Sequence, residues 1–209
     1  MIGTMATVAA TQYSSGAAVD GRMARAARTN DAVVEAFLSL IEEGDLRPGA
    51  QRIAQRAGVS LRSVFHHFQD LETLVAAAAE RQIRRVAAPA PLPTEGPITG
   101  RIEAFAAARS RMLEAITPVR RAAVLNEPFS PALAARLKWA RDLARDEAAG
   151  VFHVELRGRK PSDRRDLLAA LAVAAEWSTW EALRAHQGLS VAQSRRVMVR
   201  TIGALLKEE

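Results

Sequence analysis

The sequence contains no cysteine among its 209 residues. Disulfide bonds, thiolate nucleophiles and sulfur-ligated metal sites are therefore excluded, and the absence fits a reducing compartment. Uninterrupted apolar runs of about 18 residues are also lacking, so we expect no membrane span and no membrane partner. The first twenty residues show no basic start followed by an apolar block, which argues against a signal peptide. We therefore expect a protein that stays in the cytoplasm.

Motifs typical of catalysis and metal binding are absent as well. The sequence contains no Gly-x-Ser-x-Gly, no phosphate-binding glycine loop and no His-Glu-x-x-His. His66 and His67 are adjacent, but neighbouring residues on a helix point about 100° apart, and no third ligand lies within motif distance. We therefore predict no catalytic residue, no metal and no cofactor, and we do not expect an enzyme.

The net charge of +6 is unevenly distributed along the chain. Residues 1–100 hold ten arginines and ten acidic residues, so the whole excess lies in the second half. Locally the signs are sorted, because residues 31–45 carry acids and no base, whereas residues 46–69 carry four arginines and no acid. The overall charge is thus no argument for nucleic-acid binding, and solvated helix faces are the alternative interpretation of these segments.

Apolar residues recur at helical spacing along the chain, without period-two alternation and without an internal repeat. We predict a first helix from about residue 29 to 43 ended by Gly44, a second ended by Gly58, a third capped by Ser60 and a fourth capped by Asp70. The predicted core of these helices contains Val33, Ala36, Phe37, Leu40, Ile41, Ile53, Ala54, Val64, Phe68, Leu71, Leu74, Val75 and Ala78.

Residues 87–100 contain four prolines and two glycines, which marks a linker to a second helical region. There we predict a helix closed by Pro118, a helix opened by Ser130 and the proline after it, and a long helix capped by Ser162. A capping box at Ser190 would open the final helix. The chain is therefore predicted to be all-α.

The run that begins at Ile53, IAQRAGVSLRSVFHHF, has the layout of a helix-turn-helix. Its first helix meets Gly58, which can adopt the left-handed conformation that a tight turn requires, and Ser60 starts the second helix. In such a unit the second helix enters the major groove with its N-terminal residues at the base edges. The base-facing side chains would come from Leu61, Arg62, Ser63 and His66.

The span from about Thr29 to Leu74 resembles the N-terminal domain of the tetracycline-repressor-like (TetR) family of transcriptional regulators. It combines an apolar helix ending in glycine, the motif Ile-Ala-x-x-Ala-Gly-Val-Ser, an aromatic-x-His-Phe segment from Phe65, and an acidic residue with leucine in the fourth helix. The resemblance covers roughly a quarter of the chain, and beyond it only the architecture matches. DNA contacts are expected from Arg25, Arg28, Arg47, Arg52, Ser60, Leu61, Arg62, Ser63, Phe65, His66 and His67.

Three positions depart from the family pattern. Phe65 replaces the usual tyrosine and lacks a hydroxyl that could bond a phosphate, and Leu71 replaces a lysine of the fourth helix. Pro48 and Gly49 stand where the family has serine or threonine, which predicts a second helix without a side-chain cap. These departures predict fewer backbone contacts, for which the arginines of this region would compensate.

The resemblance implies a C-terminal domain that binds a ligand and dimerises. Ligand cavities between helices are lined by apolar groups with a few polar ones. We expect the ligand to contact Phe105, Arg109, Met112, Phe129, Trp139, Phe152, Glu176, Trp177 and Trp180, although aromatic residues at helical spacing are more often ordinary core. The last two helices would form the dimer through Leu171, Val191, Met198, Ile202 and Leu205, which could instead pack inside one subunit.

The sequence thus predicts a disordered tail over residues 1–24, a three-helix helix-turn-helix DNA-binding domain over 25–75, and a larger helical ligand-binding and dimerisation domain over 76–209. The predicted function is that of a transcriptional regulator, a repressor by the family's commonest mode. As a homodimer it would bind a palindromic double-stranded DNA operator and be released by a small apolar or amphipathic effector. One alternative is a helical sensing or scaffold protein that acts through protein partners. Another is a small-molecule enzyme built in the helical cavity.

Overall fold

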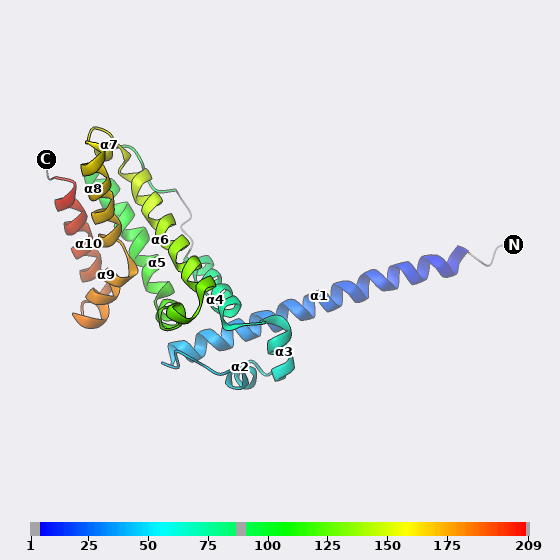
Figure 1. Cartoon of the computed structure of the whole chain (residues 1–209). Helices are drawn as coiled ribbons and strands as arrows, with labels where there is room; N and C mark the ends of the chain where they lie inside the picture. The colour runs from blue at the N-terminus through cyan, green and yellow to red at the C-terminus, as the bar shows by residue number, and fades with distance from the viewer. Residues whose placement is uncertain (1–4, 87–90, 208–209) are drawn as a thin grey trace. The chain divides into compact units, whose positions relative to one another are not determined.

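The computed structural model describes residues 5–86 and 91–207, with side chains over residues 23–85 and 91–207. Helices make up its regular structure, and no strand occurs among the described residues, which confirms the all-α prediction. The chain divides into two compact units, Met1–Ala78 and Ala79–Glu209 (Figure 1). None of the helices described is long and apolar enough to cross a membrane.

The first unit contains the helices α1 (Met5–Glu42), α2 (Ala50–Ala57), α3 (Leu61–His67) and the beginning of α4 (Leu71–Val86). The residues of the predicted core of this unit are buried except Leu71, which is half-buried, and Val33, Phe37 and Leu40 are completely hidden from solvent. The helical spacing of the apolar residues therefore identified the inner face of each helix correctly.

The predicted ends of the first and second helices and the predicted starts of α3 and α4 are also confirmed, because they depend on local chemistry. Gly44 has a φ of 96° and Gly58 a φ of 66°, a region that residues with a side chain rarely adopt. Asp70 precedes α4 and accepts a hydrogen bond from the Thr73 amide at 2.7 Å. This bond lowers the pKa of Asp70. Gly49 provides no side-chain cap for α2, as the departure from the family pattern predicts.

The beginning of α1 differs from the sequence prediction. The helix extends back to Met5, into residues for which the sequence predicts a disordered tail, instead of beginning near residue 29. The reason lies in the composition, since the first proline of the chain is Pro48 and this segment is rich in alanine, the strongest helix former. The proposed domain boundaries stay a prediction.

The second unit holds the rest of α4 and the helices of the C-terminal region. These are α5 (Ile98–Asn126), η1 (Glu127–Phe129), α6 (Pro131–Val151), α7 (His153–Leu156), α8 (Pro161–Ala174), α9 (Trp177–Glu181), the π-helix η2 (Ala182–His186) and α10 (Val191–Leu205). Within this unit α5 lies between α6 and α10 (Figure 1). Its core includes Phe105, Leu113, Phe152, Leu171, Trp180, Met198 and Ile202.

Two helices of the second unit have boundaries that differ from the prediction. Pro118 does not end its helix, because α5 continues to Asn126 and buries Val119, Ala122 and Ala123 beyond the proline. Burial of these residues offsets the cost of a proline in a helix interior, about 3 kcal/mol. The long helix predicted from Ser162 to about residue 187 starts earlier and has no side-chain cap. It also ends at Ala174, and α9 and η2 follow it as separate helices.

An ion pair inside the second unit joins α5 to α7. The Arg101 side chain is 5% exposed and that of Glu155 is 15% exposed. Arg101 donates to both carboxylate oxygens of Glu155 and, at 2.7 Å, to the Val151 carbonyl oxygen. The guanidinium lowers the pKa of Glu155, and the carboxylate raises the pKa of Arg101. Because both charges of this pair are hydrogen-bonded, the pair fixes the position of α7 relative to α5.

Candidate functional site

The helix-turn-helix is formed by α2 and α3 around the turn at Gly58. The Ser60 hydroxyl, immediately before α3, accepts a hydrogen bond from the Ser63 amide at 3.1 Å, which confirms the predicted cap. Val64 and Phe68 are 3% and 4% exposed and fix one side of α3 in the core. The opposite side of this short helix therefore faces solvent.

The solvent face of α3 carries the predicted base-contacting residues. Leu61 is 43% exposed and Phe65 is 56% exposed, and Arg62 and His66 are exposed beside them. Ser63 is half-buried, with its hydroxyl bonded to the capping hydroxyl at 2.9 Å. Within the described part of the chain Arg62 makes no hydrogen bond or ion pair. The face thus combines apolar groups that can contact thymine methyls with an arginine that can bond guanine.

The arginines of α2, unlike Arg62, form ion pairs with acidic residues. Arg52 donates to Asp45 at 2.7 Å, while its side chain is still 59% exposed. Arg56 donates to both oxygens of Glu43 at 2.7 and 2.8 Å and lowers the pKa of that carboxyl group. These pairs attach α2 to the end of α1, a role that the sequence did not reveal for Arg56. The remaining predicted phosphate contacts are exposed on the same unit, namely Arg25, Arg28 and Arg47.

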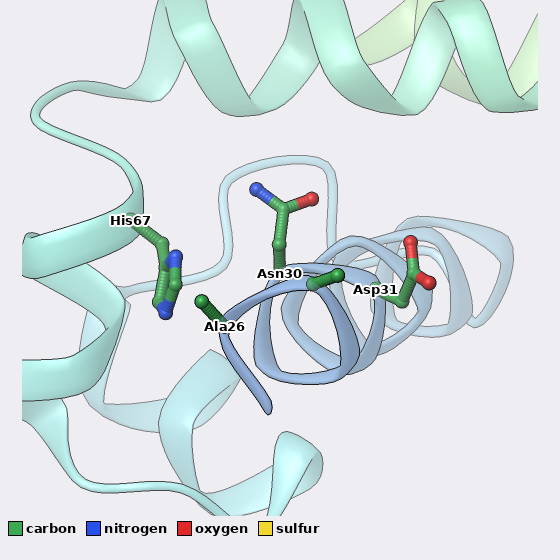
Figure 2. A pocket seen from close by; sticks show the side chains of 5 residues that line it. Ala26, Asn30, Asp31 and His67 are labelled. Atoms are coloured by element: carbon green, nitrogen blue, oxygen red, sulfur yellow. The ribbon is translucent and has the colours of Figure 1, made fainter. Parts of the chain in front are cut away.

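His67 faces the first helix of the unit. A hollow of about 370 Å³ lies between His67 and the α1 residues Ala26, Ala27, Asn30 and Asp31. Figure 2 shows the imidazole turned from α3 toward Ala26, with Asn30 across the hollow. The structure therefore places His67 at the contact between α1 and α3. Its contact with DNA stays a prediction.

Three of the predicted ligand-binding residues occupy the interior of the second unit. The Phe105 and Phe152 rings are fully buried and meet edge to face with their centroids 5.3 Å apart. Trp180 is also fully buried, and its Nε1 donates to Glu114 at 3.0 Å. In this structure the three side chains fill the core instead of lining an open cavity.

The other predicted ligand-binding residues fall into two groups. Phe129 is 79% exposed and Trp139 is 60% exposed, so the prediction that they line an internal cavity is wrong for the subunit described. Met112, Glu176 and Trp177 are half-buried. The sequence pattern could not separate the groups, because helical spacing does not say which face of a helix meets its neighbour.

Arg109 has a structural contact at the break between α8 and α9. Its guanidinium donates to the Ala175 carbonyl oxygen at 2.9 Å, where the last carbonyls of α8 lack helical partners. Burial lowers the pKa of Arg109, although the charges of Glu147 and Glu176 oppose this effect. Its Nε is buried without a hydrogen-bond partner. The contact positions the chain just before Trp177.

A second hollow, of about 590 Å³, lies between α5 and α10. It is lined by Glu103, Ala107, Arg195, Arg196, Val199 and Arg200. None of these residues is among the predicted ligand contacts, and no sequence motif singles them out. The hollow therefore does not support the predicted cavity.

The predicted dimer contacts are largely buried within the subunit. Leu171, Met198 and Ile202 are each at most 1% exposed and belong to the core, so their assignment to the dimer interface is wrong. Leu205 is half-buried against the same core, and Val191 is 38% exposed. The apolar stripe of α10 faces α5 because that face completes the subunit's own core.

The outer faces of α8 and α10 carry other apolar side chains. Val173 of α8 is 59% exposed and Val197 of α10 is 37% exposed. Neither valine was predicted as a dimer contact, because neither lies on the apolar helix face from which the dimer contacts were predicted. Within the described residues no group of three His, Asp or Glu side chains could hold a metal ion.

The fold is shared with solved transcriptional regulators at low sequence identity. One from Rhodococcus sp. Rha1 superposes with a TM-score of 0.63 at 19% identity, over 85% of this chain and 96% of that chain. A protein from Mesorhizobium loti MAFF303099 assigned to the TetR family gives 0.63 at 22% identity, over 87% and 96%. The multidrug binding protein EbrR, in complex with imidazole, gives 0.55 at 19% identity, over 83% and 94%.

No family model and no curated protein matches the sequence. At these identities the likeness concerns the fold, and it extends over most of both chains in each comparison. The likeness therefore reaches well beyond the quarter of the chain in which the sequence itself resembles the TetR family. The chain has the fold of TetR-family transcriptional regulators.

Proposed function

We propose that the protein is a ligand-responsive transcriptional regulator that binds a palindromic DNA operator as a homodimer and is released by a small effector. Repression is the mode that we propose, since release by an effector then switches transcription on. The protein would act in the cytoplasm, where an operator is accessible, and we assign it no enzymatic activity.

The proposal rests on the exposed face of α3. Leu61 and Phe65 lie in water on a helix whose other side is fixed in the core, and Arg62 stands between them without a partner in the described chain. Apolar side chains exposed together are costly unless a partner surface covers them. Because the helix is short and capped at its N-terminus by Ser60, its first turn can approach base edges in a major groove.

A mobility-shift assay with the DNA upstream of the protein's own gene tests this function. We expect a complex that resists competition by unrelated DNA and weakens steeply with salt, because arginine contacts to phosphate release counterions. Arg62→Ala should lose the specific complex first. As a matched control, Arg111→Ala removes an exposed arginine of the second unit and should leave the shift unchanged. The absence of any specific complex would favour the alternative of a protein-partner scaffold.

The homodimer is proposed to form through the outer faces of α8 and α10. Val173 and Val197 are exposed apolar side chains of these helices, as is Val191 at the start of α10, and a palindromic operator requires two recognition helices related by a two-fold axis. Light scattering at micromolar concentration should give twice the subunit mass. Val173→Glu combined with Val197→Glu should give a monomer, whereas Val154→Glu, at a 55% exposed valine of α7, should not. A wild-type monomer would refute the dimer.

The coupling of ligand and DNA is proposed to run through α4. This helix contributes residues to both units, and in the second unit its Glu80 accepts a hydrogen bond from Arg136 of α6 at 2.9 Å. A ligand that displaces α6 would therefore displace α4, and the first residues of α4 belong to the unit that contains the helix-turn-helix. Couplings of this kind are typically worth about 1–3 kcal/mol, so effector should weaken operator binding roughly 5- to 150-fold.

A further inference from the structure

Arg120 differs from the arginines around it. It lies on α5 three turns after Arg109, is half-buried, and its Nε is buried without a hydrogen-bond partner. No carboxylate among the described residues forms an ion pair with it, and its guanidinium lies 5.8 Å from the centre of the Trp177 ring. A partly buried cation without an acidic partner is costly, so this arrangement needs an explanation.

Two acids attract Arg120 without a direct bond to it. Glu127 accepts from Arg141 at 3.0 Å instead, and Glu176 likewise forms no ion pair with Arg120. Burial lowers the pKa of Arg120, the neighbouring charge of Arg141 lowers it further, and the attraction of Glu127 and Glu176 opposes both effects. Arg120 thus lacks the direct anionic contact that would stabilise its buried charge.

The same place offers an apolar surface. Trp177 is half-buried, and its Nε1 is held by the Thr117 hydroxyl at 3.1 Å, so the ring has a fixed orientation on α5. Ile116 is also half-buried and packs against the core, one helical turn before Arg120. Ile116, Arg120 and Trp177 are all half-buried, so each keeps part of its surface open to solvent. A cation beside a fixed aromatic ring and an aliphatic group suits an amphipathic acid.

We propose that the effector is an amphipathic carboxylate, whose anionic group pairs with Arg120 and whose apolar body packs on Trp177 and Ile116. This assignment rests on the function proposed above, and it replaces the broader expectation of any apolar or amphipathic effector with an anionic class. It also gives Arg109 a positioning role, since its bond to the Ala175 carbonyl holds the chain that leads into Trp177.

Octanoate, octanamide and octylammonium form the test series, because they share one apolar chain and differ in the charge of the head group. Binding is followed by tryptophan fluorescence in a Trp139→Phe protein, which removes a tryptophan that is 60% exposed and keeps Trp177 and the fully buried Trp180 as emitters. No DNA is present. We expect octanoate to bind at least tenfold more tightly than octanamide, and octylammonium not to bind. Equal affinities for the acid and the amide, or no octanoate binding, would overturn the proposal.

Variants of Arg120 separate a binding role from a structural one. Arg120→Met should abolish the preference for octanoate while leaving the thermal unfolding temperature unchanged or higher, since it removes an unpaired charge. Arg120→Lys should restore part of the preference, and Arg111→Met, at an exposed arginine of the same helix, should retain all of it. An Arg120→Met protein that unfolds earlier but keeps the preference would assign Arg120 a structural role and overturn the proposal.

The mobility-shift assay then separates the two proposals. Octanoate should release the operator from the wild-type protein and not from Arg120→Met. If the operator complex forms but octanoate does not bind, the effector class is wrong and the DNA-binding function stands. If octanoate binds with the expected preference but no operator complex forms, the carboxylate site stands and the regulatory function fails.

Discussion

Several arginines of the two units lie in opposite environments. In the first unit Arg52 and Arg62 lie in water, and the one ion pair that Arg52 makes is at the surface. In the second unit Arg101 is almost completely buried against Glu155, and Arg120 is half-buried without an acidic partner. The difference matches two kinds of partner. A DNA backbone is solvated, so exposed arginines on the protein surface can contact it. A small ligand between helices, or an internal ion pair, instead requires arginines that are buried.

Removal of Arg101 should have the largest effect on stability. Arg101→Met leaves Glu155 buried without its cation, and loss of one member of a buried pair costs about 3 kcal/mol or more. Urea unfolding should therefore show a clearly lower midpoint than the wild-type protein. A midpoint unchanged by Arg101→Met would mean that the pair is not a stabilising element of the second unit.

The pH dependence of that loss follows from the lowered pKa of Glu155. A carboxyl group whose pKa is depressed in the folded state stabilises the protein above its unfolded value, near 4.5, and loses this contribution as the pH falls further. The difference between wild type and Arg101→Met should thus be full at neutral pH and shrink below about 4.5. A difference that stays constant with pH would contradict the ion-pair explanation.

Arg62→Ala should have the next largest effect, on DNA and not on folding. Loss of a bidentate contact to guanine should cost about 1–3 kcal/mol at its own base pair and relax the preference there. Unfolding should change by less than about 0.5 kcal/mol, because the side chain is exposed. Fluorescence anisotropy on a panel of single-base operator variants measures the preference. Wild-type discrimination in the mutant would show that another side chain reads that position.

Ser60→Ala should cost about 1 kcal/mol of stability, the usual value of an N-terminal cap. Because α3 has only seven residues, loss of the cap should also loosen the recognition helix and weaken operator binding. Hydrogen exchange of the α3 amides is the measurement. The matched control is Ser162→Ala, which changes a serine that does not cap its helix and should have no comparable effect.

Arg52→Ala should have only a small effect on stability, under about 1 kcal/mol, because the pair with Asp45 is exposed. Its effect on DNA should be uniform across sequences, since a phosphate contact carries no base information. A salt titration of operator affinity should show a shallower slope for the variant. An unchanged slope would indicate that the Arg52 side chain does not contact the backbone.

Local chemistry explains what could be predicted from the sequence. Gly58, Ser60 and Asp70 act within four residues of their own position, and each has the predicted conformation or cap. Helical spacing likewise gave the core of the first unit. The features that escaped prediction depend on which helix faces meet. Ile202 faces α5 and not a second subunit, and Trp139 is in solvent, and neither fact is contained in the spacing along one helix.

The burial of charged side chains could not be predicted from the sequence either. Arg101 and Arg120 both belong to α5, and nothing in their neighbouring residues distinguishes a paired buried arginine from an unpaired one. The pairing of Arg101 depends on Glu155, which lies 54 positions away in the sequence. The absence of an ion pair at Arg120 depends in part on Glu127, which is bonded to Arg141 instead, and only the folded chain reveals this.

We propose that the exposed face of α3 reads a specific DNA sequence. The most direct measurement is the ratio of dissociation constants for the upstream DNA fragment and a scrambled duplex of equal length, at about 0.15 M salt. We expect a ratio of at least about 10³ for the wild-type protein, in the range of specific regulators, and a markedly smaller one for Arg62→Ala. A ratio close to one for the wild-type protein, on every fragment from its own upstream region, would contradict it.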